Sequence, residues 1–188
     1  GAVVLLLIFI ISFASPWIAP YDYLALDLDN KWARPSAAHL MGTDDKGRDV
    51  LSRLMEGARF SLIICFTSVT LGTAGGFLLG LASGYFRGTF DMLVQRVIDI
   101  KMAIPSLILT LLIVGAIGHR VGSLWAVIIA LSVLGLTRGT RVIRASAMSA
   151  RESVYVDAAR AVGCSEARIM FRHVMPATIA PLIIVVSV

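Results

Sequence analysis

The sequence has little charge: only 15% of its 188 residues are Asp, Glu, Lys or Arg, whereas 57% are hydrophobic and the mean hydropathy is +0.85. Soluble domains usually carry about 25% charged residues. The low charge therefore excludes an ordinary soluble protein and indicates an integral membrane protein. A net charge of +5 could suggest a nucleic-acid partner, but the basic residues lie in polar segments between apolar runs. Membrane topology explains them more simply, and we expect no nucleic-acid binding.

Cysteine is also scarce, and its two positions exclude a disulfide framework. Cys65 lies in an apolar run and Cys164 in an arginine-rich polar insert, which we expect in the bilayer and the cytosol respectively. No histidine or acid stands where it would activate Cys164, so we interpret this residue as a small side chain that fills a turn.

The motifs of nucleotide binding and hydrolysis are missing as well. None of the three lysines, Lys31, Lys46 and Lys101, stands in a GxxxxGK[ST] loop, so the chain has no Walker A site of its own. It contains neither a GxSG nor an HExxH motif, and no apolar run holds a pair of aspartates. We expect no catalytic residues, no metal site and no cofactor bound by this chain.

Apolar runs dominate what remains. A helix rises 1.5 Å per residue, so about 20 residues cross a hydrocarbon core of about 30 Å. Alternating strand patterns are absent, which predicts an all-α, polytopic transmembrane bundle. Because the chain both begins and ends inside an apolar run, we expect a piece of a longer protein with six spans. The five spans expected here are residues 2–19, 60–86, 102–118, 121–137 and 174–188.

The four complete spans, drawn in this way, contain no Asp, Glu, Lys, Arg or His. Proton-coupled carriers usually keep at least one such group at depth in the membrane. A carrier of this class would therefore need a buried acid beyond the present sequence, and it stays open as an alternative.

The distribution of charge predicts the orientation. Residues 138–172 carry seven arginines against three acids, so this segment is expected in the cytoplasm together with residues 87–101. Residues 20–59, with six basic and seven acidic side chains, are then outside. We divide the chain into residues 1–59, a first transmembrane helix with an external loop, and residues 60–188, the membrane core with a cytoplasmic loop at 138–173. Within the external loop, residues 49–57 are expected to form a short amphipathic helix on the membrane surface.

Glycine recurs every fourth residue in the second span, at Gly72, Gly76, Gly80 and Gly84. Such a stripe allows another helix to approach closely. Since each glycine costs about 1 kcal/mol of helix propensity, its repeated use predicts a packed partner helix rather than a lipid-facing surface.

The polar insert from Tyr155 to Pro176 has the pattern of a helix, a tight turn and a second helix. The first helix is expected to close at Gly163, where glycine takes a left-handed conformation. Ser165 and Glu166 then supply a cap and a negative first turn for the second helix. The adjacent Ala158 and Ala159 would leave a shallow surface for a protein partner. An ordinary cytoplasmic loop that obeys the positive-inside rule is the alternative.

Three segments of the chain resemble the membrane subunits of ABC importers. Asp157, Ala158, Ala159, Gly163 and Pro176 are similar to the EAA motif, in which Glu-Ala-Ala is followed by three residues, Gly, nine residues and Ile-x-Leu-Pro. Asp157 stands in place of the usual Glu. His173 and Met175 replace the usual Ile and Leu. Residues 42–62 and 96–107 resemble the dipeptide, oligopeptide and nickel permeases.

The resemblance implies a permease subunit with the type I ABC importer fold, located in the bacterial cytoplasmic (inner) membrane. Such a subunit pairs with a homologous second permease. Two separate ATP-binding subunits hydrolyse Mg-ATP on the cytoplasmic side, and an extracytoplasmic solute-binding protein delivers the substrate. Di- or oligopeptides are the expected substrates, with nickel or other small solutes as alternatives. The docking residues for the ATPase would be Asp157, Ala158, Ala159, Gly163 and Pro176, flanked by Arg160 and Arg168.

A membrane scaffold or assembly factor would use the same insert to dock a cytoplasmic partner without moving solute. Neighbouring reading frames that encode a Walker A protein and a secreted binding protein would favour transport over this alternative.

Overall fold

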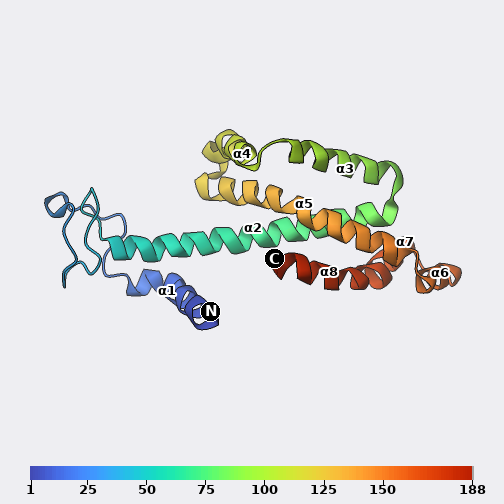
Figure 1. Ribbon diagram of the computed structural model, residues 1–188, viewed down its shortest axis with the longest axis horizontal. Coiled ribbons are helices and arrows are strands. Elements are labelled where there is room, and N and C mark those ends of the chain that lie inside the picture. The colour runs from blue at the N-terminus through green and yellow to red at the C-terminus, as the bar shows by residue number, and fades with distance from the viewer. Residues whose placement is uncertain (188) are drawn as a thin grey trace. The chain divides into compact units, whose positions relative to one another are not determined.

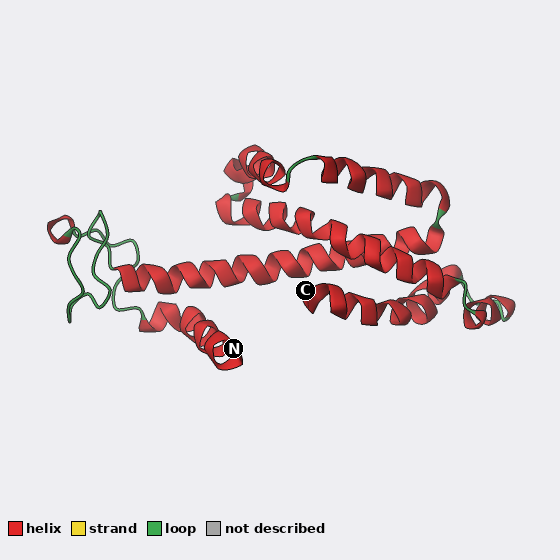
Figure 2. Ribbon diagram, viewed as in Figure 1, coloured by secondary structure: helices red, strands yellow, loops and turns green. Residues whose placement is uncertain are grey.

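The computed structural model describes the backbone of residues 1–187 and the side chains as far as Ile184. The described residues form helices and loops with no strand, apart from an isolated bridge between Thr43 and Asp49 (Figures 1 and 2). The predicted all-α fold is confirmed. In chain order the helical elements are α1 (Ala2–Ile18), η1 (Leu28–Asn30), α2 (Val50–Phe86), α3 (Gly88–Ala103), α4 (Ser106–Val121), α5 (Ser123–Arg151), α6 (Val154–Ala161), α7 (Glu166–Ile169), the π-helical η2 (Met170–Val174) and α8 (Met175–Ser187).

Three of the described helices are long and apolar enough to cross a membrane. They are α2, α5 and the continuous helix Glu166–Ile184. A fourth span arises only if α3 and α4 are counted together, and these two helices are bent by 99°. α1 is apolar but has 17 residues. Each of the five predicted spans overlaps a described helix, although the span 102–118 crosses the bend between α3 and α4 and residue 188 lies outside the described residues. Three to four of the spans have the length and composition of a crossing.

Two segments differ from the sequence prediction, because residues expected outside the spans are part of long helices. The expected separate surface helix at residues 49–57 is the start of α2. The Asp49 side chain accepts a hydrogen bond from the backbone N–H of Ser52 (2.8 Å), and the helix then continues without a break to Phe86. The expected cytoplasmic loop at 87–101 is the helix α3. Its apolar residues Phe90, Leu93 and Val97 recur at helical spacing between the charges.

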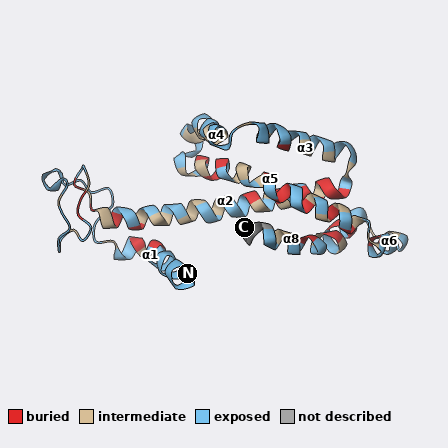
Figure 3. Ribbon diagram, viewed as in Figure 1, coloured by how far each residue is buried: buried red, intermediate tan, exposed pale blue. Residues whose placement is uncertain are grey.

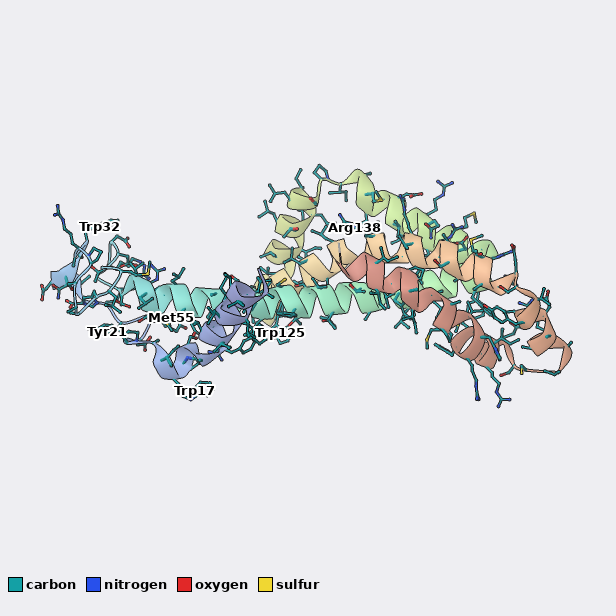
Figure 4. All side chains as sticks on the ribbon, turned by 60° about the horizontal axis from the view of Figure 1, so that its bottom comes forward. Trp17, Tyr21, Trp32, Met55, Trp125 and Arg138 are labelled. Carbon is teal, nitrogen blue, oxygen red and sulfur yellow. The ribbon has the colours of Figure 1, made fainter. Side chains whose placement is uncertain are left out.

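The chain divides into two compact units, residues 1–65 and 66–188. In the first unit, the Ser15 hydroxyl donates to the Glu56 carboxylate (2.6 Å) and so joins α1 to the start of α2. The loop between them is held by ion pairs, with Asp44 contacting Arg48 (2.7 Å) and Arg53. His39 contacts the buried Asp49 at 3.0 Å. Figure 4 labels Trp17, Tyr21, Trp32 and Met55 of this unit.

The ion pairs of the external loop predict its dependence on pH. Burial disfavours the charged form of Asp44, but hydrogen bonds from the Arg48 side chain and from the backbone of Lys46 and Arg48 outweigh it and lower the pKa of this carboxyl below 3.8. A lowered pKa stabilises the fold above the unfolded-state value, and that stability is lost as the pH falls through the folded-state pKa. We expect hydrogen exchange in residues 33–52, corrected for intrinsic rates, to accelerate only below pH 3.8.

The same acceleration is expected at pH 7 in Asp44→Asn. Asp45→Asn is the matched control, because Asp45 is half exposed and lies 3.7 Å from Arg48. Equal exchange in the two variants at pH 7 would contradict the assignment of Asp44 as the residue that holds the loop.

Candidate functional site

The elbow, residues 152–169, connects α5 to the last described helix and contains α6 and α7. α6 ends at Ala161, and Gly163 follows with φ +79°, the left-handed conformation predicted for it. Apart from its chain neighbours, no described residue has an atom within 4 Å of the place where a Cβ of residue 163 would stand, so the backbone angle is what requires glycine. Ser165 then accepts a hydrogen bond from the backbone N–H of Arg168 (3.4 Å), with Glu166 in the first turn of α7. The predicted helix, turn and helix are all present.

α6 has one buried side and one exposed side (Figure 3). Val156 is fully buried and Ala159 is only 6% exposed, and both belong to a hydrophobic cluster with residues of α2, α5 and η2. On the other side, Val154 is 84% exposed and Ala158 is exposed as well. The shallow surface expected from two adjacent alanines is therefore formed by Ala158 alone, because successive helical residues point about 100° apart.

The exposed side of α6 is largely apolar. Val154, Tyr155 and Val162 are all large exposed side chains, and Ala158 lies among them in the sequence. Chemically, the elbow offers exposed apolar side chains beside the Asp157–Arg160 ion pair.

The remaining residues singled out in the sequence lie around this surface. Asp157 and Arg160 form an ion pair at 3.0 Å within α6. Arg168 is exposed in α7, and Pro176 is exposed in the first turn of α8. Since proline has no N–H, it removes one backbone bond from the helix, and the widened π-helical turn η2 lies directly before it.

Contacts to the end of α2 hold the elbow in place, and sequence reasoning missed them. Tyr85 is 1% exposed, and its hydroxyl donates to the Glu166 carboxylate. The Arg151 guanidinium lies 5.5 Å from the centroid of the Tyr85 ring. A guanidinium N–H of Arg87 donates to Glu152 at 2.7 Å. In the sequence, a tyrosine at the end of an apolar run indicates a polar contact at that position. It does not reveal that the partner is Glu166, 81 residues away.

The glycine stripe of α2 lies against α5. A Cβ added at Gly72, Gly76, Gly80 or Gly84 would lie 2.9, 2.7, 2.6 or 2.5 Å from the carbonyl oxygens of Ser132, Leu136, Thr140 and Arg144 respectively. These four acceptors are themselves four residues apart, so the two helices keep one register over several turns, side by side in Figure 1. Only glycine permits this approach of backbone to backbone.

The arginines of residues 138–151 lie on α5 rather than in a loop, and acids of α3 pair with two of them. Arg144 donates to Asp91 at 2.6 and 2.5 Å, and Arg141 donates to Asp99 at 2.8 Å. Arg138 is exposed on α5 (Figure 4). These pairs tie α3 to α5 and neutralise charge that the sequence assigned to solvent.

Comparison with known families decides the identity of the chain. The family model for the binding-protein-dependent transport system inner membrane component matches residues 76–187. The chain belongs to this family. A second model, for the N-terminal transmembrane domain of oligopeptide transport permease C, matches residues 1–35. The predicted membership is confirmed. The region that the first model matches includes the whole elbow and three of the four stripe glycines.

The curated relatives of the chain are permease proteins. The chain is 38% identical over 187 residues to a putative peptide transport system permease protein of Brucella suis, covering 100% of this chain and 62% of that protein. It is 35% identical to the dipeptide transport system permease protein DppC of Alkalihalophilus pseudofirmus, covering 98% and 60%. It is 32% identical to the glutathione transport system permease protein GsiD of Pectobacterium atrosepticum, covering 100% and 61%. The chain thus spans about three fifths of the length of these relatives.

Proposed function

We propose that the chain is part of the membrane-spanning permease subunit of an ATP-driven ABC importer that brings di- or oligopeptides across the bacterial cytoplasmic membrane. The observation that carries this proposal is the elbow, a short helix with an exposed apolar side inside a family of binding-protein-dependent transport components. The names of the relatives support the substrate class, since they refer to peptides, a dipeptide and the tripeptide glutathione.

The partners follow from the chemistry that the chain lacks. With no Walker A motif of its own, it depends on two separate ATP-binding subunits that carry Mg-ATP, and it binds no cofactor itself. A homologous second permease completes the membrane path, and an extracytoplasmic solute-binding protein delivers the peptide. The ATPase binds α6, with Ala158 at the contact and the Asp157–Arg160 ion pair beside it.

Transport is then a shift between two populations of the permease. Closure of the ATPase subunits around ATP pulls the two elbows of the permease pair toward each other, which favours the outward-open arrangement of the helices. To move the ratio of outward-open permease to the other state from 1:99 to 99:1, the closed ATPase must bind the outward-open state more tightly by about 5.5 kcal/mol. An ATP-driven closure that acts on a firmly held helix can supply this amount.

Reconstitution of the complete transporter tests the proposal. The full-length permease pair and the ATPase subunits encoded beside it are placed in liposomes with the binding protein, and uptake of a radiolabelled dipeptide is followed. We expect uptake that requires ATP and that is lost when the Walker A lysine of the ATPase is replaced. Uptake without ATP would indicate a proton-coupled carrier. A stable complex that moves no peptide under any condition would indicate a scaffold, and either result would reject the proposal.

A further inference from the structure

Residues 85–87, at the junction of α2 and α3, contact the chain on both sides of α6. Glu152 lies just before α6 and accepts a hydrogen bond from Arg87 at 2.7 Å. Glu166 lies just after the turn that follows α6 and accepts from the hydroxyl of Tyr85. Tyr85 and Arg87 are two residues apart in the chain, so a single short segment holds the elbow on both sides of the docking helix.

Protein encloses the Tyr85 side of this contact, whereas Glu166 is exposed. The Tyr85 side chain is 1% exposed and belongs to the same hydrophobic cluster as Val156 and Ala159 on the buried side of α6. Arg151 covers its ring at 5.5 Å. The hydrogen bond that this buried phenol donates is charge-assisted, because its acceptor is a carboxylate.

The Arg87 contact depends on an unusual backbone conformation. Its φ is +57°, in the left-handed region that residues other than glycine rarely adopt. From this position the guanidinium donates both to Glu152 and to the backbone oxygen of Met148 at 3.1 Å. The two contacts to the α5–α6 corner offset the strain of the backbone.

We infer that Tyr85 and Arg87 are positioning residues that transmit displacement of α6 to α2. The inference rests on the proposed function, because it assigns a transmission role to the same elbow. Since the glycine stripe packs α2 against α5 backbone to backbone, movement passed to the end of α2 is shared by both helices. Without these two contacts, the end of α2 would follow α6 only through the apolar packing of Val156 and Ala159.

Tyr85→Phe tests the inference most sharply, because it removes one hydroxyl and keeps the ring beneath Arg151. In the reconstituted transporter we expect the number of dipeptides moved per ATP to fall about tenfold, the effect of losing one hydrogen bond to a charged group. The basal ATPase rate and the amount of ATPase bound to the permease should not change. Tyr23→Phe is the matched control, because no hydrogen bond of the Tyr23 hydroxyl is found among the described residues.

A second pair of variants separates transmission from mere stability. Glu166→Gln retains an acceptor for the Tyr85 hydroxyl, so it should keep most of the coupling. Tyr85→Phe combined with Glu166→Gln should be no worse than Tyr85→Phe alone. Arg87→Gln should uncouple in the same way, with the exposed Arg96→Gln as its control.

The outcomes distinguish this inference from the proposed function. A wild-type complex that moves no peptide with ATP rejects the proposed function itself. A wild-type complex that transports, together with a Tyr85→Phe complex that moves the same number of peptides per ATP, overturns the inference alone. So does a Tyr85→Phe variant whose only defect is a lower yield or thermal stability of the assembled complex.

Discussion

Replacing Ala158 by arginine is expected to abolish both ATPase binding and transport. Ala158 is exposed on the apolar side of α6, so the new side chain does not disturb the cluster beneath it. At a closed contact with the ATPase, however, it would bury an unpaired charge. A penalty of about 3 kcal/mol or more corresponds to a loss of affinity above about a hundredfold. Co-purification of the ATPase with the tagged permease, followed by dipeptide uptake, measures both effects.

The control for this variant is Ala145→Arg, which adds the same charge at an exposed alanine of α5 outside the elbow. It should insert, assemble and transport like the wild type. Arginine at Ala159 is a less informative change, because Ala159 is buried and a charge there would disrupt the elbow itself. Normal co-purification of the ATPase with Ala158→Arg would refute the assignment of α6 as the docking helix.

Replacing Gly80 by leucine is expected to separate α2 from α5. A Cβ at this position would lie 2.6 Å from the carbonyl oxygen of Thr140 and 3.0 Å from the Cβ of Ile143, so backbone must move to admit it. Overpacking of this kind costs about 1–3 kcal/mol and sometimes more, which exceeds the gain of about 1 kcal/mol in helix propensity. We expect a large loss of resistance to unfolding by sodium dodecyl sulfate, with Gly80→Ala intermediate.

Gly115→Leu is the matched control for the stripe. Gly115 lies in α4, and no atom stands within 4 Å of its would-be Cβ. This variant gains helix propensity without a clash, so its midpoint of unfolding should equal or exceed that of the wild type. If Gly80→Leu unfolds no more easily than Gly115→Leu, the close packing of α2 on α5 is wrong.

The sequence predicted those features of the fold that depend on local patterns. Apolar runs indicate helices wherever the backbone cannot bond to water, and the left-handed Gly163 with the cap at Ser165 defines the turn of the elbow. The spacing of the stripe glycines predicts a neighbouring helix, and in the structure this helix is α5.

Features that depend on distant pairing could not be predicted. α3 was expected to be a loop because its charges were assigned to water, whereas Asp91 and Asp99 pair with arginines of α5. The adjacent Ala158 and Ala159 suggest one surface, but Ala159 faces inward because it packs in the hydrophobic cluster beneath α6. The hydrogen bond from Tyr85 to Glu166 joins residues 81 positions apart, and no local sequence pattern predicts it.

Thiol crosslinking from α6 is the most direct test of the central claim. Ala158→Cys is introduced in a full-length permease whose Cys65 and Cys164 are replaced by serine. The introduced thiol of the assembled transporter is labelled with a benzophenone maleimide, and irradiation then links the benzophenone to a C–H bond of whatever protein it touches. The account predicts a covalent product that contains the permease and the ATPase subunit, with a yield that changes when ATP is bound. It is contradicted if no such product forms in the assembled complex, or if a membrane-impermeant maleimide labels the introduced thiol from outside intact cells.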